Sequence, residues 1–170
     1  MSKKLKIFGA IFILALAISS CSKRDKYPIE PVIKFYSFTK IDNGFNVDDK
    51  AILSLSFTDG DGDIGLDISD TAPPFNLNGD YYNNCIIDYY EKQKGNFVKV
   101  VLPFSMNARI PKIDAQVANR GIRGNIEIEL FVNNVLSSYD TIRFTAHIYD
   151  RALHKSNEVI TPEFVIDKKP

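Results

Sequence analysis

Residues 126–132 read Ile-Glu-Ile-Glu-Leu-Phe-Val, with an apolar residue at every second position. Because successive side chains of a β-strand point to opposite faces, this order gives the strand one apolar face and one largely polar face. The same period of two runs through residues 53–57 and 142–148. Such patterning is typical of strands that bury one face. We therefore expect a protein built from half-buried β-strands.

The complete pattern predicts about seven strands, which cover residues 31–39, 50–58, 84–91, 96–103, 124–133, 139–149 and 158–167. Turn-forming Asn, Gly and Ser residues lie between several of them. No segment keeps a long 3.6-residue apolar period, although residues 112–120 are compatible with one short helical turn. Antiparallel strands without helices to cover a parallel sheet predict an all-β fold of two packed sheets.

The first 21 residues carry a separate signal. Lysines at the start precede an apolar run from Ile7 to Ile18, and Ser19-Ser20-Cys21 follows. The run is shorter than the ~20 residues that span a bilayer, so it predicts a secretion signal. An apolar residue and two small residues before a cysteine resemble the lipobox of bacterial lipoproteins. The resemblance implies that residues 1–20 are cleaved and that Cys21 is acylated, which anchors the protein in a membrane of the cell envelope. Because Ser22 and not an aspartate follows the cysteine, it implies the outer membrane.

The remaining 150 residues divide into a polar tether, residues 21–30, and one domain, residues 31–170. A domain of this size buries about two thirds of its unfolded surface. Residues 21–170 together have 18 basic and 21 acidic residues, a net charge of −3, because the leader holds three lysines and no acid. This mildly acidic composition argues against a nucleic-acid partner. With Cys21 acylated, Cys85 has no partner for an internal disulfide, and its apolar neighbours predict a buried thiol.

The connection at residues 59–83 is unusually long and opens with Asp-Gly-Asp-Gly-Asp-Ile-Gly. Carboxylates at Asp59, Asp61 and Asp63 can curl around one point because the glycines between them permit a tight coil. A hard cation with six to eight oxygen ligands suits this arrangement, and calcium accepts irregular cages. The alternative is a solvated turn, since Asp-Gly is a common turn dipeptide.

The loop resembles the Asp-x-Asp-x-Asp calcium loops of EF-hands and dockerins. That resemblance implies two further ligands, the carbonyl of Gly65 at the seventh position and Asp70 at the twelfth. The sixth position, glycine in EF-hands, is Ile64, and no helix is predicted after the loop. Only the calcium-binding function is therefore carried over, not the EF-hand fold.

Residues 149–157, Tyr-Asp-Arg-Ala-Leu-His-Lys-Ser-Asn, resemble the Asp-x-Ala-Gly-Asn-x-Ser turn of bacterial immunoglobulin-like and cadherin-like domains. Leu153-His154 replaces Gly-Asn in this match. The resemblance implies an all-β, two-sheet antiparallel immunoglobulin-like sandwich of about seven strands. In that fold the loop after the second strand and the loop before the last lie at the same pole. Asp150 could then be a remote calcium ligand, or simply a surface aspartate that caps a hairpin.

Residues 71–84 are rich in Pro, Gly and Asn and contain Phe75, Tyr81 and Tyr82. Aromatic faces beside amide groups suit the binding of a glycan or a protein. Alternatively, these aromatic residues pin the long loop to its own domain.

The sequence contains no catalytic motif: its two histidines are isolated, and it has no nucleophile elbow, His-Glu-x-x-His or phosphate loop. We therefore do not expect an enzyme; a carbohydrate-active enzyme is the weakest alternative. Two roles compete. The first is a membrane-anchored accessory module whose calcium-stabilised loops contact a protein or a glycan. The second is a structural subunit of a cell-envelope assembly.

Overall fold

The computed structural model describes residues 26–113 and 121–168. The lipobox, Cys21 and most of the predicted helical turn at residues 112–120 lie outside this part of the chain. Over the described residues all regular elements are strands, and none of them is a helix that could cross a membrane.

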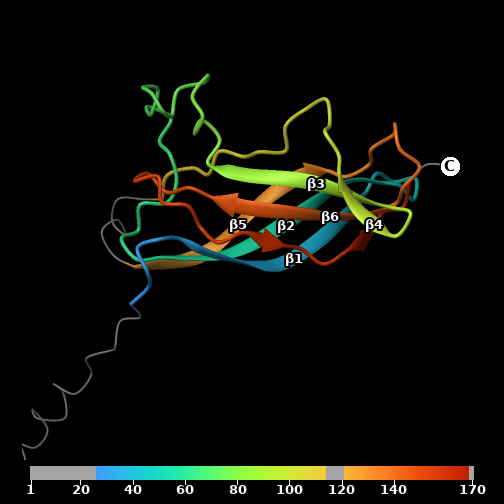
Figure 1. Ribbon diagram of the computed structural model, residues 1–170, viewed down its shortest axis with the longest axis horizontal. Helices are drawn as coiled ribbons and strands as arrows, with labels where there is room; N and C mark the ends of the chain where they lie inside the picture. The colour runs from blue at the N-terminus through green and yellow to red at the C-terminus, as the bar shows by residue number, and fades with distance from the viewer. Residues whose placement is uncertain (1–25, 114–120, 169–170) are drawn as a thin grey trace, which may run out of the picture.

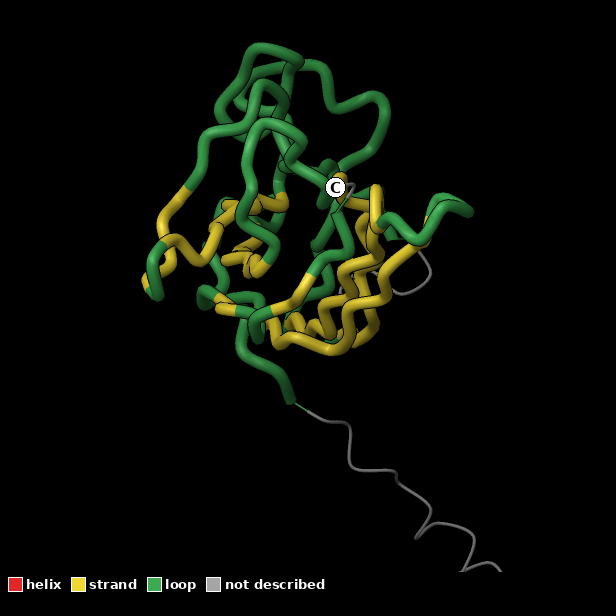
Figure 2. Tube along the Cα trace, turned by 90° about the vertical axis from the view of Figure 1, so that its right-hand side faces the viewer, coloured by secondary structure: helices red, strands yellow, loops and turns green. Residues whose placement is uncertain are grey.

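Two antiparallel sheets pack face to face, as Figure 1 and the end-on view in Figure 2 show. The first sheet has the order β1-β2-β5 and consists of β1 (Val32–Asp42), β2 (Asp48–Asp59) and β5 (Ile122–Phe131). The second has the order β4-β3-β6-β7, with β8 also paired to β6. Its strands are β3 (Cys85–Gln93), β4 (Asn96–Lys99), β6 (Thr141–Ile148), β7 (Val159–Ile160) and β8 (Phe164–Val165). The predicted all-β, two-sheet antiparallel sandwich is confirmed.

Two strand predictions need correction. The strand predicted at residues 96–103 ends at Lys99, after which the chain leaves the sheet and Val101 is exposed. The strand predicted at residues 158–167 is split into β7 and β8. Pro162 lies in the gap, where its missing N–H removes one hydrogen bond that a ladder would need.

The core lies between the sheets and is formed by the apolar faces that the period of two predicted. Leu53 and Leu55 of β2 and Phe144 of β6 are completely buried. At one side of the core the ring of Phe38 stacks on that of Phe164, with 3.9 Å between the centroids. The buried core residues of the described part of the chain all lie between Ile33 and Ile166, so residues 22–170 contain the whole of the described sandwich.

Cys85 is the first residue of β3 and is a buried, free thiol. Burial raises its pKa to about 12 because the thiolate would lose its hydration. At neutral pH the group is therefore a protonated, inert core residue, in agreement with the burial predicted from its apolar neighbours.

One end of the sandwich gathers the segments in which the sequence predicted a cation site, and we call residues 59–63 and 149–154 the acidic pole. The amide N–H of Arg151 donates to the carbonyl of Asp63, with 3.3 Å between the two atoms. The tether reaches the domain at the same end (Figure 1), where the carbonyl oxygens of Tyr27 and Pro28 lie 2.5 Å from the position of a Cβ on Gly60. Any residue larger than glycine would therefore displace the tether.

Candidate metal site

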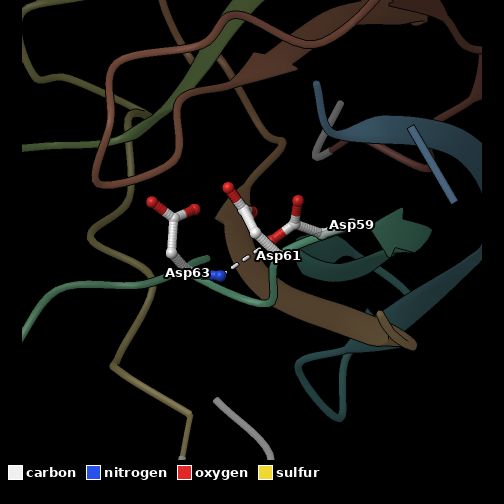
Figure 3. Close-up of side chains that lie close together, drawn as sticks. All are labelled: Asp59, Asp61 and Asp63. Carbon is white, nitrogen blue, oxygen red and sulfur yellow. Dashed lines mark hydrogen bonds between the residues drawn. The ribbon is translucent and has the colours of Figure 1, made fainter. Parts of the chain in front are cut away.

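The acidic pole begins where β2 ends. Asp59 is the last residue of β2 and is completely buried, whereas Asp61 and Asp63 are half-buried. Gly62 has a φ of 75°, a left-handed conformation that glycine adopts without strain, and it turns the chain back on itself. One carboxylate oxygen of each of the three aspartates lies within 4.8 Å of the others (Figure 3). The sequence therefore correctly placed these three side chains around one point.

The backbone holds one oxygen of Asp59 and one of Asp63. The amide of Asp63 donates to Asp59 Oδ2 at 2.9 Å, and the amide of Ala152 donates to Asp63 Oδ2 at 3.1 Å. The three Oδ1 atoms of Asp59, Asp61 and Asp63 are buried and have no hydrogen-bond partner among the described residues. A buried acceptor without a partner costs about 1–3 kcal/mol, more when it is charged. A cation bound between the three carboxylates would compensate such oxygens.

The electrostatics of the site agree with this geometry. Burial, followed by the negative charges of Asp61 and Asp63, raises the pKa of Asp59 to about 7. The pKa of Asp63 is also raised, chiefly by burial and then by the charge of Asp150. Both shifts mean that the ionised cluster is unfavourable without a counter-charge. The three aspartates are thus a group that could hold a metal ion.

Asp150 is completely buried at the edge of this cluster. Its charge contributes to the raised pKa of both Asp59 and Asp63. Its two oxygens are engaged by His154: the amide donates to Oδ1 at 2.7 Å, and Nδ1 lies 2.8 Å from Oδ2. This contact raises the pKa of His154. The structure thus brings Asp150 to the acidic pole, as predicted, but as a residue that closes its own turn beside the three aspartates.

Asp70, the predicted twelfth-position ligand, does not join the three aspartates. Its two oxygens form a bidentate ion pair with Arg151, with 3.0 Å from Nη2 to Oδ1. The amide of Asp67 donates to Asp70 Oδ2 at 2.7 Å. The hydrogen bonds from Arg151 lower the pKa of Asp70, so that the carboxylate stays ionised. EF-hand counting fails here because an arginine from the neighbouring turn neutralises this carboxylate.

Gly65, the predicted seventh-position ligand, has a packing role. Its φ is 94°, and a Cβ would lie 2.2 Å from the carbonyl oxygen of Pro111. This close approach lets Leu66 exchange backbone hydrogen bonds with Ile110 and Lys112, at 2.9 and 3.0 Å. The segment that follows the aspartates is therefore fixed to the rest of the domain.

Arg109 holds the long loop together, and the sequence did not single it out. Its guanidinium donates to four backbone carbonyl oxygens at 2.7–3.2 Å. These belong to Asp67, Asp70, Phe75 and Tyr82. Carbonyl acceptors occur in every residue, so no pattern of side chains could have indicated this role.

The three aromatic residues predicted to bind a ligand are half-buried against their own domain. The ring of Tyr82 lies 4.9 Å from the guanidinium of Arg109, and the ring of Tyr81 meets that of Tyr149 edge-on at 4.9 Å. Phe75 is tied down through its carbonyl. These contacts favour the alternative that the aromatics pin the loop. The exposed apolar residues of this loop are Ile68, at 95 %, and Leu77, at 73 %.

The acidic pole thus combines three converging carboxylates, three buried oxygens without partners and a neighbouring turn that is hydrogen-bonded to the cluster. This combination can bind a cation. No protein-family model, curated protein or solved structure matches this chain.

Proposed function

We propose that this chain is a lipid-anchored protein of the cell envelope whose β-sandwich binds one calcium ion at the acidic pole. The observation that carries the proposal is the set of three buried Oδ1 atoms, on Asp59, Asp61 and Asp63, that have no partner among the described residues. Calcium suits three carboxylates on one irregular loop, because it tolerates variable ligand number and geometry, whereas magnesium requires a near-ideal octahedron.

Calcium binding would serve to order the long loop. Asp63 connects the cluster to the turn at residues 149–154, the Asp70–Arg151 pair connects that turn to the loop, and Arg109 gathers the loop's carbonyls. A cation that holds Asp59 and Asp63 together therefore stabilises a surface that extends to the exposed Ile68 and Leu77. We infer that this surface contacts a protein or a glycan of the envelope.

The lipid anchor fits the position of the tether. Tyr27, which packs against Gly60, lies six positions after Cys21. Six residue steps span at most about 20 Å when fully extended, so acylation would hold the acidic pole near the membrane surface.

Calcium titration of residues 22–170 tests the site. Isothermal calorimetry should give one calcium per chain, and D61N should weaken the affinity at least tenfold because it removes one charged ligand. D80N is the matched control, since Asp80 is an exposed aspartate of the same loop outside the cluster, and it should bind like the wild type. If calcium gives neither heat nor a shift in melting temperature, there is no calcium site.

Membrane fractionation tests the anchor. The full-length wild type expressed in a bacterium should be found in the membrane fraction and should incorporate a labelled fatty acid. C21A should incorporate none, because the thiol is the acylated group. Labelling that persists in C21A would disprove the predicted anchor, and C85A, which changes only the buried thiol, should remain labelled.

A further inference from the structure

The outer edge of β5 is unpaired. The order β1-β2-β5 leaves one side of this ten-residue strand without a neighbouring strand among the described residues. The amide of Val132 donates to the carbonyl of Asp49, which fixes the hydrogen-bonding register with β2. These bonds alternate along an antiparallel ladder. The backbone N–H and C=O groups of the even-numbered residues therefore point towards β2, and those of the odd-numbered residues point away from it. Outward-directed N–H and C=O groups thus belong to Asn125, Glu127, Glu129 and Phe131.

An apolar groove continues this edge at the end of the sandwich remote from the acidic pole. It lies between residues 102–104 and 131–136 and has a volume of about 90 Å³. The rings of Phe104 and Phe131 meet there with 6.0 Å between their centroids. Val135 and Leu136 are 81 % and 85 % exposed. Exposed apolar groups gathered at one place are typical of a binding surface, and this volume is well below the roughly 300 Å³ of a small-molecule pocket. The groove has room for a single apolar side chain.

The two described ends of the domain do not provide the occupant. The tether leaves from the opposite end of the sandwich (Figure 1). Lys168, whose ammonium donates to the carbonyls of Asn134 and Ser137, lies at the rim of the groove. Neither the described tether nor Lys168 therefore lies along β5 or fills the groove.

A second copy of the chain fits the edge but not the groove. If two β5 strands pair antiparallel about Ile126, each Arg123 lies opposite a Glu129, which is favourable in charge. The same register places Phe131 opposite Gly121 of the copy, so the apolar groove receives no apolar side chain.

We propose that β5 and this groove bind an extended segment of a partner protein. The segment adds to the sheet as a strand antiparallel to β5 and inserts one apolar side chain between Phe104, Phe131 and Leu136. Main-chain hydrogen bonds then give affinity and the groove gives specificity. Lys50 already pairs with Glu129 at 2.6 Å, so the exposed carboxylate of Glu127 predicts a lysine or arginine at the position of the segment that lies beside it. This surface is distinct from the acidic pole and does not depend on calcium.

A phage-displayed library of random nonapeptides, selected on residues 22–170, tests the proposal. Enriched peptides should carry an apolar residue near one end and a basic residue at a fixed spacing from it. L136E should reduce their affinity at least tenfold, because it places a charge in the groove. Leu136 is 85 % exposed, so this variant should fold normally. The matched control is I160E, an apolar-to-acidic change at an exposed position of β7 in the other sheet, which should bind the peptides normally.

Backbone methylation of a selected peptide tests the strand pairing itself. N-methyl groups on the alternate amides that face β5 should reduce affinity at least tenfold, whereas the same groups on the intervening amides should not. The proposal is overturned if no peptide is enriched, if L136E binds like the wild type, or if both methylation patterns have equal effects. Dimers in sedimentation that R123E disrupts and R123E/E129R restores would assign the edge to a second copy and would also overturn it.

Discussion

Calcium at a thousandfold excess over its dissociation constant is expected to raise the free energy of unfolding of residues 22–170 by about 4 kcal/mol. For a domain of this size such a gain corresponds to an increase of about 10 °C in melting temperature. The physical reason is that the folded state gathers three carboxylates with uncompensated oxygens, whereas the unfolded chain separates them. Thermal unfolding followed by circular dichroism, with calcium and then with excess chelator, measures the effect. A melting temperature that the chelator leaves unchanged would contradict it.

The stability of the calcium-free protein should fall as the pH rises from acid to neutral, opposite to the trend of most domains. The pKa of Asp59 is raised to about 7 in the folded protein, above its ordinary value of 3.8 in the unfolded chain. The folded state therefore binds this proton more tightly, so its stabilising effect is complete below pH 4 and is lost as the pH rises to 7. We expect the calcium-free domain to melt at a lower temperature at pH 7.5 than at pH 5.5. Calcium should reverse this order, because it competes with the proton.

D59N separates a metal ligand from a purely structural aspartate. The neutral amide keeps an oxygen that can accept from the amide of Asp63, but it removes the charge that burial and Asp61 make unfavourable. The calcium-free variant should therefore be more stable than the wild type at pH 7.5 and should gain no stability from calcium. D80N should behave like the wild type in both conditions. Destabilisation of D59N without calcium would show that the ionised carboxylate itself supports the fold.

The alternating apolar pattern predicted the sheets because burial on one face is a local property of each strand. Along β5 and β6, every residue assigned to the core face by the period of two is buried. The pattern failed at Val101, which continues an apolar run in the sequence but is 89 % exposed. Such a run indicates a strand only while a neighbour pairs with it, and the chain leaves the sheet after Lys99. Pairing is a long-range property, so the sequence could not show where it ends.

The residues of the candidate site also differ in whether the local sequence could predict their role. Asp59, Asp61 and Asp63 converge because of their spacing and the intervening glycines, which are visible in five residues of sequence. The pairing of Asp70 with Arg151 joins residues 81 positions apart and depends on how two loops meet. Counting ligand positions as in an EF-hand loop assigned Asp70 to the cation, because such counting considers the loop without the rest of the fold. The local pattern does not show which ion-pair and hydrogen-bond partners the rest of the fold brings to each side chain.

R109M is expected to lower the free energy of unfolding by about 3 kcal/mol, because four carbonyl oxygens lose a charged donor at once. Methionine keeps the length and apolar part of the side chain, so packing on Tyr82 is largely retained. The loss is less than four times the value for one hydrogen bond, since the loop is partly exposed and water can replace some of the bonds. Urea denaturation measures the difference.

R109M should destabilise the long loop more than it destabilises the domain as a whole. Hydrogen exchange at residues 67–82 should accelerate in R109M far more than exchange in β2 or β6, because only the loop depends on this guanidinium. R109K should fall between R109M and the wild type, since an ammonium cannot reach four separate carbonyls in the geometry of the planar fork.

The matched control is R143M, because the guanidinium of Arg143 lies over the ring of Phe97 at 4.1 Å on a sheet surface, and its loss should cost less than about 1 kcal/mol. Equal effects of R109M and R143M would show that the long loop is held by its packing and not by Arg109. If R109M also weakens calcium binding, the order of the loop and the geometry of the three aspartates are coupled through Asp70 and Arg151.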